Sequence, residues 1–466
     1  MAKLRSFGAD FYLIQSPDAV QAAYRNQGLD IVPLALGFLG RSCGAPQSFT
    51  ASLLDQANSS TGHDYWHISN KLVRDNLAGG DPLRQMNERI LNRVSYKLEN
   101  EVKKGVDIAS GVYHVSNFYQ WIWTTMAMAN TDAMFGETTN PFRKPGILQK
   151  YWTWEQEHLN ILYAPFLPWL TARKAYNARA SVLSALTDFA NTIGDAGDNS
   201  ILTKNCQNLN KEHDVHGGEA ATIYLALVFG ATANAFPTLY WMLLFVFRDP
   251  GLLRDLRAEL ESSGIVSEED VGQGPSPSRG VRVVEAGRIT ATSCPLLLSC
   301  YTETLRLVSR HPGARVVTAD PAAALSFRDG RTGEQRSYAL NKGSIVHMPA
   351  GMLHSSERHW GPDAAHFDGY RFMRLDRAAD RQARKAHIAL GGGKHLCPGR
   401  HMAFAEIMAT VAVFVAGFEL ETTHADLPDM VHQFGLGIVK PDEANDLSAS
   451  IRPRRDAQNV TWKFRV

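Results

Sequence analysis

One cysteine in a glycine-rich segment is the residue whose surroundings point most clearly to chemistry. The segment HIALGGGKHLCPGRHMAFAEI, residues 387–407, places three glycines and a basic pair ahead of Cys397, and an apolar helical pattern follows it. Glycine-rich turns next to a helix start can bind phosphate through backbone N–H groups, and a thiolate is a strong metal ligand. The segment is therefore open to three interpretations: a phosphate-binding loop, an ordinary connection, or a metal site at Cys397.

The phosphate interpretation fails on the details of the motif. A Walker-type loop needs a serine or threonine directly after its lysine, but Lys394 is followed by His395. The dinucleotide fingerprint needs a glycine three residues after its second glycine, and Leu396 stands three residues after Gly393. We do not expect this loop to bind phosphate.

The residues after Cys397 favour a helix that starts at the sulfur. Pro398 suits the first position of a helix, and the following apolar residues predict a buried helix that closes at Gly417. The helix dipole and the unpaired N–H groups there favour a thiolate. The glycines 391–393 let the backbone bend close to the sulfur and to a flat group above it. With no second sulfur or histidine at metal-cage spacing, the pattern fits an iron whose other ligands come from a porphyrin.

The other cysteines have no such surroundings. The chain has five, an odd number without any C-x-x-C pair, which argues against a disulfide framework or a zinc site and is typical of a reducing compartment. Free cysteines are usually small buried hydrophobes. We expect that role for Cys43, Cys206, Cys294 and Cys300.

The segment around Cys397 resembles the haem-binding signature of the cytochrome P450 superfamily, F-x-x-G-x-x-x-C-x-G. Gly393, Cys397 and Gly399 match it, while Leu390 stands where the family has an aromatic residue. His395 occupies the position of a basic residue that contacts a haem propionate in the family. The resemblance implies that Cys397 is the axial ligand of a haem iron.

Two further motifs occur in the family's order. Glu303 and Arg306 lie three residues apart in an apolar helical segment, a spacing that lets them pair; the competing E-x-x-R at residues 285–288 contains a glycine and adjoins a loop. Arg371, in HFDGYRF, matches the family arginine that joins this pair. The resemblance implies a buried ion network on the proximal side of the haem, which we interpret as specifying the fold rather than as catalytic.

Contacts to the haem propionates are less clear from the sequence. Arg315, in HPGAR, stands where the family often has a propionate-binding arginine. The family's W-x-x-x-R contact has a candidate in DYWHISNKLVRDNL, where Lys71 or Arg74 could serve, although a solvated helix face explains both residues equally well.

The stretch from residue 220 to residue 247 contains no charged residue. Its length would suffice to cross a membrane, but a helix that is covered on every side in a large domain has the same composition. Gly230, Asn234 and Pro237 interrupt the stretch. We expect a buried central helix, with a membrane span as the alternative.

The middle of this central helix reads GATAN, residues 230–234. Oxygen-activating family members carry an acid–alcohol pair here; Ala233 replaces the acid and Asn234 the alcohol, with Pro237 expected to kink the helix. The pattern resembles the branch with the sterol 7α-hydroxylases, prostacyclin synthase and related fungal enzymes. Family analogy places Asn234 and Thr232 at the oxygen face. An amide can orient a water molecule but relays protons poorly, and a packing role for Asn234 is the alternative.

The amino-acid composition and the hydrophobic patterns limit the possible architectures. The 466 residues carry a net charge of +1 and no basic stripe, so a nucleic-acid partner is not expected. Helical patterns dominate, and short strands are expected late in the chain between residues 314 and 349. We expect a mainly α protein with a smaller β region, the cytochrome P450 fold, as a single domain over residues 1–466. No membrane anchor is visible near the start, so both the cytoplasmic face of the endoplasmic reticulum, by family analogy, and the cytoplasm stay open.

The resemblance implies a haem-thiolate monooxygenase containing haem b. Its substrate would be a hydrophobic small molecule such as a sterol, terpenoid or polyketide, its electrons would come from an NADPH-dependent reductase, and it would act as a monomer. Because of the altered acid–alcohol pair, a redox-neutral isomerase or dehydratase is the competing enzyme, and a haem-binding sensor is the non-enzymatic alternative. The expected substrate contacts are Phe229, Ala233, Val316, Val317, Phe434 and Leu436.

Overall fold

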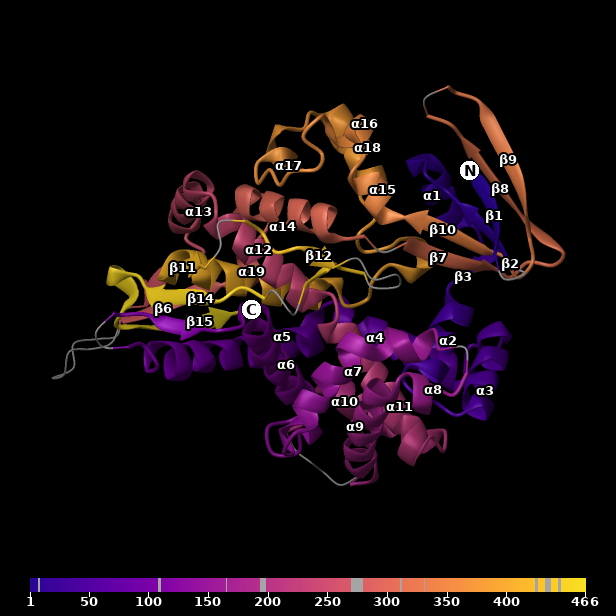
Figure 1. Cartoon of the computed structure of the whole chain (residues 1–466), viewed down its shortest axis with the longest axis horizontal. Helices are drawn as coiled ribbons and strands as arrows, with labels where there is room; N and C mark the ends of the chain where they lie inside the picture. The colour runs from indigo at the N-terminus through magenta and orange to yellow at the C-terminus, as the bar shows by residue number, and fades with distance from the viewer. Residues whose placement is uncertain are drawn as a thin grey trace.

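Figure 1 shows a computed structural model of the chain, in which a large helical body carries a smaller β region at one side. It describes all residues except 7–8, 108–109, 165, 193–197, 270–279, 311, 331, 424–425, 432–436 and 443–445. The expected contacts Phe434 and Leu436 therefore lie outside the described residues.

Helices make up most of the fold. The helices of the first half are α1 (Pro17–Arg25), α2 (Val32–Arg41), α3 (Gln47–Asn58), α4 (Tyr65–Ala78), α5 (Gly80–Lys97), α6 (Phe118–Phe135), α7 (Ile147–Leu162), α8 (Pro168–Thr171), α9 (Arg173–Asn191) and α10 (Ile201–Glu212). Those of the second half are α11 (Gly217–Thr232), α12 (Ala235–Phe247), α13 (Pro250–Ser262), α14 (Pro295–Val308), α15 (Ala350–His354), α16 (Glu357–Trp360), α17 (Arg371–Arg374), α18 (Arg377–Ala386) and α19 (Arg400–Gly417).

The strands form several small sheets, and the largest has the order β1-β2-β10-β7-β3. Its strands are β1 (Ala2–Ser6), β2 (Ala9–Leu13), β3 (Leu29–Asp30), β7 (Pro312–Val317) and β10 (Ile345–Pro349). The hairpin of β8 (Ala322–Arg328) and β9 (Gln335–Asn341) extends beside this sheet (Figure 1). The remaining strands are β4 (Tyr113–Val115), β5 (Val266–Glu269), β6 (Gly280–Glu285), β11 (Phe418–Thr422), β12 (Met430–Val431), β13 (Lys440–Pro441), β14 (Ala449–Pro453) and β15 (Val460–Arg465).

The predicted long central helix exists but is broken in the middle. α11 ends at Thr232 and α12 begins at Ala235. The break lies before Pro237, as expected of a proline, which has no N–H for the carbonyl of Ala233 four residues earlier and whose ring crowds that carbonyl. Regular helical bonding resumes one residue later, where the carbonyl of Asn234 accepts hydrogen bonds from the backbone N–H and the hydroxyl of Thr238.

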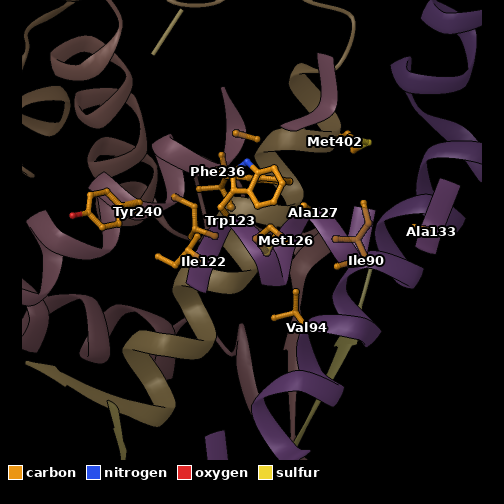
Figure 2. Packing of buried hydrophobic residues seen from close by; sticks show 14 of the residues in the cluster. Ile90, Val94, Ile122, Trp123, Met126, Ala127, Ala133, Phe236, Tyr240 and Met402 are labelled. Atoms are coloured by element: carbon orange, nitrogen blue, oxygen red, sulfur yellow. The ribbon is translucent and has the colours of Figure 1, made fainter. Parts of the chain in front are cut away.

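Both apolar helices long enough to span a membrane are packed largely inside the protein. They are the combined stretch Gly217–Phe247, with 61% of its most apolar window buried, and Arg400–Gly417, with 72% buried. Figure 2 shows part of this core, in which Phe236 and Tyr240 of α12 belong to the same buried cluster as Trp123 and Met126 of α6. The composition of residues 220–247 is thus explained by burial in the core.

Helix α19 ends at Gly417, the residue at which the sequence predicts its close. The reason differs from the expected C-cap, because a Cβ on Gly417 would lie 2.4 Å from the Trp462 ring. Glycine is required there by the close approach of the C-terminal strand β15.

The expected ion network is formed and buried. Glu303 accepts hydrogen bonds from Nε and Nη2 of Arg306, both at 2.7 Å, and from Nε of Arg371 at 2.9 Å. Neither Glu303 nor Arg306 has any exposed surface. Further bonds from Arg306 to the carbonyls of His354 and Ala364 connect α14 to the segment that follows α15. The network thus connects helices to a segment with little regular structure.

Replacing Glu303 with glutamine should destabilise the fold by about 3–5 kcal/mol, because Arg306 loses its buried counter-charge and Arg371 keeps only the half-exposed Asp363. Denaturant unfolding followed by circular dichroism measures this change. The matched control is Glu285→Gln from the competing E-x-x-R segment; Glu285 pairs with the half-exposed Arg465, so the change should cost at most about 1 kcal/mol. Equal midpoints for Glu303→Gln and the wild-type protein would contradict a structural role for the network.

Candidate active site

The loop that carries Cys397 doubles back on itself. Gly391 and Gly393 have φ angles of +74° and +66°, a region that glycine adopts without strain. The N–H of Cys397 then donates to the carbonyl of Leu390 at 3.0 Å. Gly399 caps the start of α19. Cys397 therefore lies just ahead of this helix, as the sequence predicts.

The glycines allow the loop to approach a different neighbour from the one expected. A Cβ on Gly393 would lie 2.1 Å from the carbonyl oxygen of Tyr24, and one on Gly392 would lie 2.4 Å from the Tyr24 ring. The expectation that these glycines bring the backbone close to the sulfur is thus incomplete: two of them let the loop pack against α1, while Gly391 supplies the bend.

Cys397 is partly exposed, unlike the other four cysteines, which are buried as predicted. In the protein chain alone, burial raises the pKa of the Cys397 thiol, and the N–H of Gly399 and the charge of Arg400 only partly offset that effect. The sequence predicts that the helix dipole favours a thiolate, but in the chain alone the groups at the helix start do not outweigh burial. A bound metal cation would supply the missing stabilisation.

Arg315 is a buried cation close to this loop. Only 4% of it is exposed, and its guanidinium lies over the Tyr24 ring, 5.3 Å from the centroid. Its hydrogen bonds go to the carbonyls of Ala314, at 2.8 Å, and Gly392, at 3.4 Å. Among the described residues it makes no ion pair with a carboxylate. A buried guanidinium without a direct ion pair beside the cysteine loop fits a ligand that brings its own carboxylate.

His395 faces another protein side chain. Its Nε2 lies 3.0 Å from Oδ1 of Asp30, in a geometry that is poor for a hydrogen bond, and Lys394 pairs with the same carboxylate. Burial alone would raise the pKa of Asp30, but His395, Lys394 and the N–H of Val32 outweigh it and hold that pKa below its usual range. The expected propionate contact of His395 would have to compete with Asp30.

Asn234 is exposed although its neighbours in the helix are buried. Its Oδ1 accepts the backbone N–H of Ile438 at 3.2 Å, which fixes the orientation of the amide because only oxygen can accept. No hydrogen bond to its Nδ2 occurs within the described part of the chain. Gly437 passes so close that a Cβ would lie 2.2 Å from Oδ1. The amide N–H₂ group is thus left as a donor toward open space.

Thr232 lies in a different environment from Asn234. Thr232 is fully buried, and its hydroxyl donates to Oε2 of Glu155 at 2.9 Å and lies 2.5 Å from the hydroxyl of Tyr151. The hydroxyl of Thr232 is thus bonded to side chains of α7, and its expected place at the oxygen face stays a prediction.

Glu155 is the centre of a buried network that the sequence analysis missed. It has no exposed surface and also binds Nε1 of Trp123 at 3.1 Å and Nζ of Lys440 at 3.0 Å. Lys440 is 4% exposed. The network joins α6, α7, α11 and β13. Its only sequence signal is a charged residue within the aromatic run YWTWE, which does not reveal a partner almost three hundred positions away.

The other expected substrate contacts have different environments. Phe229 is partly buried and packs against Phe38, with ring centroids 4.9 Å apart, and Ala233 is 3% exposed at the helix break. Val316 is partly exposed. Val317, at 1% exposure, belongs to the core of the β region, which favours a packing role over the expected substrate contact.

The weak propionate candidates on α4 do not have the burial of Arg315. Lys71 is exposed and pairs with Asp75 at 2.6 Å, and Arg74 is exposed. Their environment fits the alternative of a solvated helix face.

Together the site offers one accessible sulfur, one buried cation and one amide donor. Within the described residues no group of three or more His, Cys, Asp or Glu side chains gathers as a metal site, so a metal at Cys397 needs further ligands that it brings with it. Beside the sulfur, nothing lies within 4 Å of a Cβ built on Gly399. These features fit an iron porphyrin: a thiolate for the metal, a guanidinium for a propionate and space at the helix start.

Comparisons with known proteins agree with this interpretation. A family model described as Cytochrome P450 matches residues 61–449. The chain is 28% identical to a cytochrome P450 monooxygenase of Gibberella zeae, over 97% of this chain and 82% of that protein. It is 27% identical to the cytochrome P450 monooxygenase nodJ of Hypoxylon pulicicidum, over 81% of this chain and 71% of that protein.

Similarity extends to sterol enzymes and to a solved structure. The rat 25-hydroxycholesterol 7-alpha-hydroxylase is 27% identical over 52% of this chain and 56% of its own length. The structure titled retinoic acid bound cyanobacterial CYP120A1 superposes with a TM-score of 0.64 over 97% of this chain and 91% of its own, at 16% identity; that likeness shows the fold. The chain belongs to the cytochrome P450 family, and is thus a haem-thiolate oxidoreductase of P450 type.

Proposed function

We propose that this protein is a monooxygenase that inserts one oxygen atom of O₂ into a hydrophobic small molecule. The observation that carries the proposal is the partly exposed Cys397 at the start of α19, with the buried Arg315, which makes no direct ion pair among the described residues, beside its loop. The two groups match two parts of a haem, the iron at the centre of its ring and the propionates at its edge. The relatives named as monooxygenases support the same reaction class.

Haem b is the proposed cofactor, with Cys397 as the ligand of its iron and Arg315 as the partner of one propionate. When bound, a haem with a thiolate ligand supplies the activation of dioxygen. The protein holds it from the proximal side through the loop that Gly392 and Gly393 fit against Tyr24. Leu390 contributes its carbonyl to the loop's closing hydrogen bond and offers an apolar side chain in place of the family's aromatic ring.

Asn234 is the proposed polar group on the oxygen side. Its Oδ1 is held by Ile438, so its Nδ2 can donate to a water molecule or to an oxygen-containing ligand. An amide has no proton to give up at neutral pH. In this proposal Asn234 therefore orients a water molecule, and protons arrive through water rather than through a side-chain acid.

The proposed substrate is apolar over most of its surface. Phe229 of α11 and Phe38 of α2 are partly buried and face one another, and aromatic walls of this kind bind flat or polycyclic hydrocarbons by burying their surface. The relatives include the sterol hydroxylase of rat and fungal monooxygenases. A sterol, terpenoid or polyketide-like substrate from secondary metabolism fits these features.

Electrons are proposed to come from an NADPH-dependent cytochrome P450 reductase, with the P450 acting as a monomer. The competing reaction is a redox-neutral isomerisation or dehydration. It is favoured by one observation, the replacement of the acid–alcohol pair by Ala233 and Asn234. An amide donor can serve either reaction, so the two differ in their need for electrons and O₂.

Turnover with ¹⁸O₂ distinguishes the two reactions. The products formed from a sterol, terpenoid and polyketide library are analysed by mass spectrometry, with and without NADPH and reductase. We expect products that carry one ¹⁸O atom and depend strictly on the reductase. Product formation at the same rate without reductant, or without label, would contradict the monooxygenase proposal and support the isomerase.

We further propose that the protein associates with a membrane surface through the connection between α7 and α9. Large apolar side chains are exposed there: 77% for Phe166, 53% for Trp169 and 61% for Leu170, with Leu167 at 51%. Exposed clusters of Trp, Phe and Leu insert into the interfacial layer of a bilayer. Attachment to the endoplasmic reticulum, where such a reductase would also lie, fits this surface.

Replacing Phe166, Trp169 and Leu170 together with serine should weaken binding to phosphatidylcholine vesicles at least about tenfold, because roughly 1 kcal/mol or more is lost per inserted side chain. Vesicle sedimentation measures the binding. Met373 of α17 is 49% exposed but isolated, and Met373→Ser is the control that should bind normally. Equal vesicle binding by the triple variant and the wild-type protein would contradict this surface.

A further inference from the structure

His158 of α7 is a buried histidine enclosed by aromatic rings. Only 2% of it is exposed. Its ring centroid lies 4.8 Å from that of Phe229, 5.5 Å from that of Trp154 and 5.8 Å from that of Phe38. These rings come from α2, α7 and α11, so three helices meet around one imidazole.

The hydrogen bonding of His158 fixes its tautomer. Nδ1 lies 2.9 Å from the carbonyl oxygen of Glu155. A carbonyl can only accept, so Nδ1 carries the proton and Nε2 has a free lone pair. Burial, the largest effect, lowers the pKa of His158 to about 4, against the opposing bond to the Glu155 carbonyl. The imidazole is neutral at physiological pH, and Nε2 stays an acceptor.

No donor in the part of the chain that the structure describes bonds to this acceptor, Nε2 of His158. Nε2 is also absent from the polar atoms that are sealed from solvent without a partner, so it still borders open space. Trp154 is fully buried, whereas Phe38 and Phe229 are only partly buried. Phe38 and Phe229 are thus the members of the enclosure that keep exposed surface.

The neighbouring donors in the described residues bond to other acceptors. Lys440 donates to Glu155 and Gln156 at 3.0 and 3.1 Å. Glu155 accepts from Lys440, Trp123 and Thr232. The indole N–H of Trp154 donates to the carbonyl of Ser42 at 3.2 Å. None of these donors bonds to Nε2, and the lone pair on His158 is left for a molecule from outside.

We infer that Nε2 of His158 accepts a hydrogen bond from a hydroxyl group of the substrate, whose apolar frame lies against Phe38 and Phe229. The inference rests on the proposed function, since it needs a hydrophobic substrate in this protein, and it narrows the substrate class to hydrophobic alcohols or phenols. His158 is then a specificity-determining residue. A molecule without a hydroxyl group leaves its buried acceptor without a hydrogen bond, which lowers the binding affinity.

The test compares alcohols with their methyl ethers, which keep the frame but lose the donor. The probes are cholesterol, the diterpene alcohol phytol and 1-naphthol, each with its O-methyl ether. Binding to the ferric, haem-loaded protein is titrated by the shift of the haem absorption band, without reductant or O₂. The outcome is therefore independent of whether the enzyme performs monooxygenation.

In the wild-type protein, the best-binding alcohol should bind roughly three- to tenfold more tightly than its ether, the range expected for one neutral hydrogen bond. His158→Phe keeps an aromatic ring but has no acceptor, so its ratio should fall to about one. His158→Gln, whose amide oxygen can accept, should recover part of the preference. Damage to packing alone would weaken alcohol and ether equally and leave their ratio unchanged.

Phe229→Leu is the matched control. It alters the wall of the same enclosure without removing a polar atom, so it should weaken both members of a pair and keep the preference for the alcohol. The inference is overturned if the wild-type protein binds no alcohol better than its ether, or if His158→Phe keeps the preference. The inference is likewise overturned if Phe229→Leu loses the preference for the alcohol over its ether while His158→Phe keeps it.

Discussion

The contact between the cysteine loop and α1 is the constraint on which the site depends. Gly393 and Gly392 lie so close to Tyr24 that no side chain fits between them, and Arg315 lies over the same tyrosine ring. One residue of the first helix thus contacts both the loop of the proposed metal ligand and the cation proposed to bind the cofactor. A chain that places its ligand in a loop needs such support, because loops otherwise hold side chains less firmly than helices and strands do.

The central helix couples the opposite side of the site to the C-terminal segment. Its break at Ala233 frees Asn234 to bind the N–H of Ile438, and two residues later Lys440 reaches Glu155. Glu155 in turn holds Thr232. The same short segment therefore contacts both sides of the helix break and α7. A shift of α7 would move the oxygen-side amide and the enclosure around His158 together.

How much the sequence could predict depended on whether a feature was local. The helix at Arg400–Gly417, its preceding cysteine and the pair Glu303–Arg306 follow from spacing within one element and were predicted. The role of Thr232 was not, because its partner Glu155 belongs to another helix and only the fold brings them together. His158 was missed for the same reason: its significance lies in three rings from three elements. The motif resemblance pointed to Cys397 as the metal ligand, but it could not identify the residues around the substrate.

The most direct test of the account is the spectrum of the reduced protein with carbon monoxide. The account predicts the red-shifted band of a thiolate-ligated haem in the wild-type protein, its loss in Cys397→Ser, and its retention in Cys206→Ser, which alters a buried cysteine. Haem content measured on the same samples separates a changed ligand from an empty site. A thiolate-type band that persists in Cys397→Ser would contradict the assignment of the metal ligand.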